Sequence, residues 1–101
     1  MEFLPLGTVV KLKEAQDNQK AMITGRASLM DHEGVVGYFD YVGVAYPQGQ
    51  ISTDNFFFNT EDIDKIYFEG YKDNEQEQEF QIVLAKAMAE NEYPKFNSKD
   101  F

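Results

Sequence analysis

The chain has 101 residues, 43% of them hydrophobic and 15% aromatic, and its 18 acidic against nine basic residues give a formal net charge of −9. A disordered acidic tail carries far fewer aromatic side chains, so we expect a single folded domain over residues 1–101. The absence of cysteine excludes disulfides, thiolate nucleophiles, zinc fingers and iron–sulfur clusters. The negative charge repels nucleic acid and anionic lipid, so neither is an expected partner. No apolar run is long enough to predict a signal peptide or a membrane span.

Residues 6–71 carry the β-branched and alternating patterns of a small antiparallel sheet. Strands are predicted, in chain order, over residues 6–13, 21–29, 35–46, 55–58 and 66–68. Polar connections are expected at 14–20, 30–34 and 47–50, where turn-forming residues gather. Gly25 inside the second strand predicts a bulge or bend. Residues 59–63, which lead from a capping side chain into acidic residues, predict one helical turn.

The C-terminal region predicts one amphipathic helix over residues 74–91. Its apolar stripe falls at positions i, i+3, i+4, i+7 and i+8, namely Phe80, Val83, Leu84, Ala87 and Met88. We expect Asp73 or Asn74 to cap its start, Tyr93-Pro94 to stop it, and the tail 95–101 to be loosely held. The predicted fold class is therefore α+β: an antiparallel sheet of about five strands, strongly curved or even barrel-like, with a C-terminal helix.

The residues favour no catalytic site. His32 is the single histidine and lies in a polar segment, so a solvated turn histidine is expected rather than a metal ligand or a triad member. No glycine-rich loop with a lysine is present to hold a phosphate. We therefore expect no enzyme activity, no cofactor and no metal. An enzyme that uses carboxylates alone would need a deep pocket lined by acids with raised pKa values.

Acidic and aromatic side chains are the features that favour binding. Residues 54–79 contain nine acids and two lysines, a net charge of −7. These acids either cap helix starts on a solvated face or form a docking surface for a basic partner. The aromatic residues exceed what one sheet face buries, so we expect some to meet the helix, a second subunit or a partner. The candidate partner-binding residues are Tyr41, Tyr46, Phe57, Glu61, Asp62, Asp64 and Tyr71.

Several short motifs, taken together and in order over roughly residues 4–71, resemble one family. They are LPLGTVVKL at 4–12, MITGR at 22–26, GYFDY at 37–41, YPQG at 46–49, FFN at 57–59 followed by Ile63, and FEGY at 68–71. The chain resembles small cytoplasmic Firmicute proteins known as a domain of unknown function. Members look like accessory proteins encoded beside LXG-type toxins in type VII secretion loci, where some act as targeting chaperones for the toxin.

The resemblance implies a cytoplasmic, non-catalytic protein that binds a protein partner, either a toxin or a secretion component. An alternative is an immunity protein that covers a basic toxin domain with an acidic face. Lys11, Lys13 and Arg26 lie on early strands, opposite in charge to the acid-rich second half. This polarity also makes a homo-oligomer an expectation.

Overall fold

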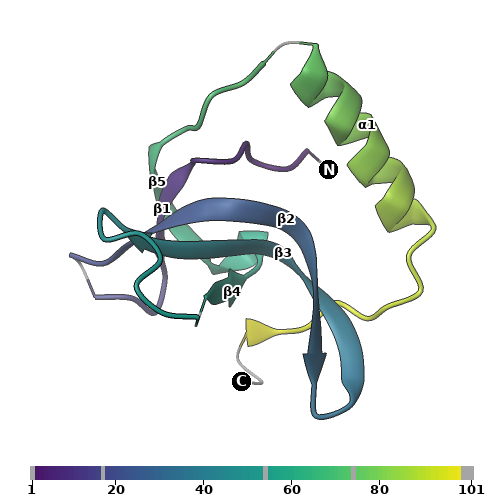
Figure 1. Cartoon of the computed structure of the whole chain (residues 1–101), viewed down its shortest axis with the longest axis horizontal. Helices are drawn as coiled ribbons and strands as arrows, with labels where there is room; N and C mark the ends of the chain where they lie inside the picture. The colour runs from purple at the N-terminus through teal and green to yellow at the C-terminus, as the bar shows by residue number, and fades with distance from the viewer. Residues whose placement is uncertain (1, 17, 54, 74, 99–101) are drawn as a thin grey trace.

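The computed structural model describes residues 2–16, 18–53, 55–73 and 75–98. In chain order these ranges form β1 (Val9–Leu12), β2 (Lys20–His32), β3 (Val35–Tyr46), β4 (Phe56–Phe58), the 3-10 turn η1 (Thr60–Asp62), β5 (Ile63–Phe68) and α1 (Gln76–Ala89). All neighbouring strands are antiparallel, in the order β4-β3-β2-β1-β5 (Figure 1). The α+β prediction is confirmed, and the sheet is open rather than closed into a barrel. No helix in the described ranges is long and apolar enough to cross a membrane.

The β2–β3 hairpin is longer than the sequence predicts. β2 continues to His32, and only Glu33 and Gly34 form the turn, with φ angles of 53° and 86°. Two positive φ values give a tight turn whose twist matches that of the strands, so no longer connection is needed. His32 therefore lies at the end of β2 rather than in the turn, so its predicted turn position is wrong, while its side chain is 43% exposed. The bulge expected at Gly25 is confirmed by a register shift between Ile23 and Gly25.

The first strand begins later than predicted because residues 5–8 form a turn. Gly7 has a φ of 85°, and the Thr8 amide donates to the Pro5 carbonyl. The buried Thr8 hydroxyl donates to the same carbonyl at 2.7 Å and accepts from the Gly70 amide at 3.0 Å. This turn therefore joins the start of β1 to the chain that leaves β5.

β5 lies beside β1 and starts at Ile63, three residues before the predicted position. Its register with β1 shifts twice, between Val9 and Val10 and between Lys11 and Leu12. Such bulges break the strict alternation of side chains along a strand. The pattern of residues 63–65 was therefore not recognisable as a strand.

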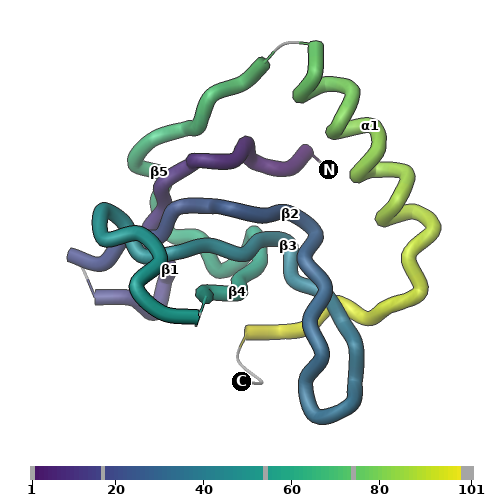
Figure 2. Tube along the Cα trace, viewed as in Figure 1, coloured from purple at the N-terminus to yellow at the C-terminus, as the bar shows by residue number. Residues whose placement is uncertain are grey.

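Helix α1 packs mainly on the N-terminal segment, which runs between the helix and the sheet (Figure 2). The Asp73 carboxylate accepts from the amides of Glu75 and Gln76, at 3.1 and 2.8 Å, so the predicted cap at Asp73 is confirmed. Asn74, the alternative cap, lies outside the described residues. The helix ends at Ala89, four residues before Tyr93.

The helix presents a different face to the protein than its apolar pattern predicts. Of the 14 residues of α1, all within the described ranges, Leu84 alone is buried. Glu77, Gln81 and Met88 are half-buried, whereas Phe80 and Val83 are 44% and 57% exposed. At 100° per residue the packed face is turned by about 60° from the predicted stripe. The apolar stripe therefore does not mark the packed face, because Phe80, Val83 and Ala87 are exposed.

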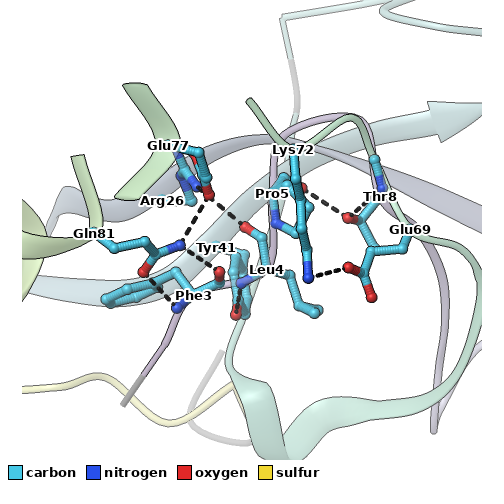
Figure 3. Close-up of polar contacts among 11 residues, drawn as sticks. Phe3, Leu4, Pro5, Thr8, Arg26, Tyr41, Glu69, Lys72, Glu77 and Gln81 are labelled. Atoms are coloured by element: carbon cyan, nitrogen blue, oxygen red, sulfur yellow. Dashed lines mark hydrogen bonds and ion pairs between the residues drawn. The ribbon is translucent and has the colours of Figure 1, made fainter. Parts of the chain in front are cut away.

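Polar contacts hold the helix in this rotation (Figure 3). Gln81 exchanges two hydrogen bonds with the backbone of Phe3, at 2.9 and 2.6 Å. The Glu77 carboxylate pairs with the Arg26 guanidinium of β2 at 2.5 Å and accepts from Gln81 at 2.9 Å. The hydrogen bond from Arg26 holds the pKa of Glu77 below its ordinary value, although partial burial opposes this shift.

The hydrophobic core lies between the sheet, the N-terminal segment and the helix. Its buried members are Phe3, Val10, Ala21, Ile23, Tyr41, Phe58 and Leu84. The Tyr41 ring packs against Phe3 and Phe58, with centroids 5.9 and 5.7 Å away. The Tyr41 hydroxyl accepts from the Leu4 amide at 3.0 Å, so this buried polar atom is satisfied.

Candidate functional site

The seven candidate partner-binding residues lie in different places. Tyr41 is only 1% exposed and belongs to the core, so its assignment to a contact surface is corrected. Phe57, Glu61 and Asp62 meet at one cleft, and Tyr46 lines another. The remaining two, Asp64 and Tyr71, lie on β5 and just after it. The candidates therefore do not form one surface.

The first cleft lies between the end of β1, β4, η1 and the C-terminal segment. Its volume is about 620 Å³, and its lining residues are Leu12, Lys13, Glu14, Phe57, Phe58, Glu61, Asp62, Asn97 and Ser98. Asp62 accepts from the Asn59 amide and from the Ser98 hydroxyl, both at 2.8 Å. Glu61 pairs with Lys95 at 3.1 Å. Both acids are thus engaged in contacts that hold the fold.

The second cleft is more apolar and holds about 580 Å³ between residues 14–20 and 45–56. Tyr46, Ile51 and Phe56 are 42%, 78% and 45% exposed there. Glu14 is the one acidic residue among its described lining. Within the described residues, no group of three or more His, Asp and Glu side chains is placed to hold a metal ion.

The β5 edge carries the third group of exposed side chains. β5 ends the strand order, so its outer edge pairs with no other described strand. Ile66 and Phe68 are 46% and 61% exposed, and Tyr71, just beyond the strand, is 83% exposed. Asp64 pairs with Lys11 at 3.5 Å. We define Ile66, Phe68 and Tyr71 as the β5 patch.

Sequence reasoning included Tyr71 but missed Ile66 and Phe68, because it treated the run at 66–68 as an ordinary short strand. Their apolar character is visible in the sequence, but their exposure is not. It follows from the place of β5 at the edge of the sheet. No local pattern reports the order of strands in a sheet.

A buried polar cluster joins β3, η1 and the C-terminal segment, and no local sequence pattern indicates it. Asp40 is 3% exposed, and its carboxylate accepts from the Thr60 amide and hydroxyl at 2.9 and 3.0 Å. Lys95 pairs with the same carboxylate at 3.1 Å. Asn59, 1% exposed, accepts from the Asp40 amide and donates to the Phe96 carbonyl. Residues 95–98 are therefore held, and the expectation of a loose tail is wrong for them.

Opposing effects act on the Lys95 ammonium in this cluster. Burial lowers its pKa, but hydrogen bonds and charges from Glu61 and Asp40 outweigh burial, so the pKa of Lys95 is raised above its ordinary value. The Lys95 ammonium is therefore expected to stay charged at neutral pH.

A family model described as a domain of unknown function (DUF4176) matches residues 3–80. The chain belongs to this family. The matched range includes all five described strands and the first turn of α1. It leaves out the rest of the helix and the C-terminal segment. Membership of a domain-of-unknown-function family, expected from the motifs, is confirmed. No curated protein and no solved structure matches the chain.

Proposed function

We propose that this protein is a non-catalytic binding protein: a cytoplasmic accessory protein or targeting chaperone for a type VII secreted LXG-type toxin in a Firmicute bacterium. The motif resemblance over residues 4–71 supports the secretion context. The observation that carries the binding role is the β5 patch, where large apolar side chains are exposed beside an unpaired strand edge. Exposed apolar groups next to free backbone donors and acceptors favour association with another chain.

The chemistry of the patch suits an extended or apolar segment of the partner. A strand added at a sheet edge gains main-chain hydrogen bonds, and exposed side chains beside it supply apolar contact. Ile66 and Phe68 would lose their contact with water in such a complex, which stabilises it. Lys65 and Asp64 within β5 would select the register through charge.

Co-purification tests the role. The chain is expressed with the N-terminal targeting half or the C-terminal catalytic half of a neighbouring LXG toxin, each produced separately. We expect retention of the targeting half. Retention of the catalytic half alone would refute the chaperone role.

A pair of variants tests the surface. Phe68→Asp places a charge in the β5 patch, and Leu29→Asp makes the same change on β2, at a side chain of similar exposure, 57% against 61%. We expect Phe68→Asp to abolish co-purification and Leu29→Asp to leave it unchanged. Equal effects of the two variants, or none of either, would show that the patch does not bind the partner.

The alternative function is an immunity protein. Two acidic side chains near β5 are exposed: Glu61 at 63% and Asp64 at 53%. Their negative charge favours a basic partner, because it speeds the encounter of the two proteins. An immunity protein would bind the catalytic half of the toxin and block its activity. The same co-purification experiment therefore separates the two functions.

A further inference from the structure

The C-terminal segment forms a short parallel strand addition on β3. β4 pairs with β3 only at residues 41–43, which leaves the same edge of β3 open toward Gly37. There the Tyr38 amide donates to the Pro94 carbonyl and the Phe96 amide donates to the Tyr38 carbonyl, both at 2.9 Å. Tyr38 and Lys95 accordingly form a parallel bridge. Figure 1 shows the segment returning from α1 to lie beside the hairpin.

Two consecutive side chains of the segment enter separate sites. Lys95 reaches the Asp40 carboxylate, whose side chain is 4% exposed. The Phe96 ring lies over Gly37, where a Cβ atom would come within 2.7 Å of it, and beside the Phe39 ring at 5.8 Å between centroids. Neighbouring residues of an extended chain point to opposite sides, so one basic and one aromatic residue in sequence fit these two sites together.

The groove residues Asp40 and Phe39 also make contacts that do not involve the segment. The Asp40 carboxylate retains two hydrogen bonds from Thr60, and Phe39 retains its contact with the Phe57 ring at 5.7 Å. The groove residues all fall within the family match at 3–80, whereas residues 94–98 fall outside it. The groove thus lies within the matched family domain, and the segment that occupies it lies beyond the matched range.

Asp40, Asn59 and Asp62 hold the segment through polar contacts, but few of the segment's own residues are buried. Pro94, Lys95 and Asn97 are exposed, and Phe96 and Ser98 are half-buried. Segments with little buried surface open locally at low free-energy cost. We therefore expect displacement of this segment to cost less free energy than unfolding of the sheet.

We propose that the edge of β3 around Gly37, Tyr38 and Asp40 is a peptide-binding groove that residues 94–98 occupy in cis. Its ligand in trans is an extended protein segment in which a lysine or arginine directly precedes an aromatic residue. Main-chain hydrogen bonds to Tyr38 supply affinity, and the Asp40 and Gly37 sites supply specificity. This groove is separate from the β5 patch, so the proposal stands independently of the proposed function.

The chain's own segment competes with a ligand for the groove, so a ligand in trans must bind tightly enough to displace it. A short tether gives a local concentration in the millimolar range, so a free peptide competes poorly with the chain's own tail. Removal of the Lys95 charge and the Phe96 ring should therefore open the groove to a peptide in trans.

Fluorescence anisotropy of a labelled peptide with the sequence of residues 92–98, EYPKFNS, tests this with the full chain. We expect the double variant Lys95→Glu/Phe96→Ala to bind the peptide at least about tenfold more tightly than the unaltered chain. Adding Asp40→Asn to that variant should weaken binding again. The peptide EYPEANS should not bind. The matched control Lys86→Glu/Val83→Ala changes an exposed lysine and an exposed apolar residue of α1 and should bind like the unaltered chain.

A folded double variant, judged by its far-ultraviolet circular dichroism, that binds no better than the unaltered chain would overturn the proposal. A second measurement avoids dependence on that variant's folding. Millimolar EYPKFNS added to the unaltered, isotope-labelled chain should shift the amide resonances of Tyr38 and Phe96 in nuclear magnetic resonance spectra. Unchanged resonances at saturating peptide would show that the segment is a permanent part of the fold.

Discussion

Leu84 provides the sharpest test of how helix α1 docks. It is 6% exposed and contacts the core, whereas its neighbour Val83 is 57% exposed. Burying a leucine side chain contributes about 1.5–3 kcal/mol, and truncation to alanine with the resulting cavity costs about 2–5 kcal/mol. The helix residues around Leu84 are exposed, so the helix can settle partly into the space. We therefore expect Leu84→Ala to lower the free energy of unfolding by about 2–3 kcal/mol.

Val83→Ala is the matched control, because it truncates an apolar residue of the same helix turn. Little burial is lost there, and alanine has the higher helix propensity, so the change should stay within about 0.5 kcal/mol. Urea unfolding followed by circular dichroism measures both values. The reasoning is refuted if Val83→Ala costs as much as Leu84→Ala, since the helix would then pack through the stripe that the apolar pattern predicted.

Two further predictions concern contacts that hold the N-terminal segment and the helix. Gly70→Ala should destabilise the protein by more than about 3 kcal/mol, because its Cβ would lie 2.0 Å from the Leu6 carbonyl oxygen, a backbone atom. The control is Gly34→Ala, because a Cβ atom there meets no atom within 4 Å. Its positive φ should cost only about 1–2 kcal/mol of stability. Equal melting temperatures for the two variants would contradict the close approach at Gly70. Glu77→Gln should lower stability at neutral pH, because the lowered pKa of Glu77 means that its charged form stabilises the folded state. That contribution is fully present above the ordinary pKa of about 4.5 and is lost as the pH falls through the lower folded-state pKa. The stability difference between the two proteins should therefore shrink below pH 4.5. A difference that stays constant down to acid pH would exclude the ion pair as its cause.

Local patterns predicted the types of element well, because they depend on short spacings. The alternation at 35–46 matches the observed bounds of β3, and Asp73 caps the helix as its side-chain chemistry suggests. Boundaries failed where a conformation depended on distant partners. The turn at residues 5–8, for example, is stabilised by Gly70, 62 positions after Thr8.

The candidate site was less predictable than the fold. Residue types suitable for binding were visible, yet Tyr41 is in the core and Asp62 supports η1. Ile66 and Phe68 became candidates only once β5 was placed at the sheet edge. An aromatic or acidic residue has the same local pattern in a core, a cap or a contact surface, so the sequence does not separate these roles.

Local sequence features were enough to identify an acidic, cysteine-free chain with a β-rich first part, a C-terminal helix and membership of its family. Tertiary structure alone decided the rotation of that helix and the placement of the C-terminal segment. The reason is the range of the interactions involved. Arg26 meets Glu77 across 51 positions and Phe3 meets Gln81 across 78, and these polar contacts, rather than the apolar stripe, select the face that packs. The Asp40–Lys95 pair likewise depends on two segments that only the folded chain brings together.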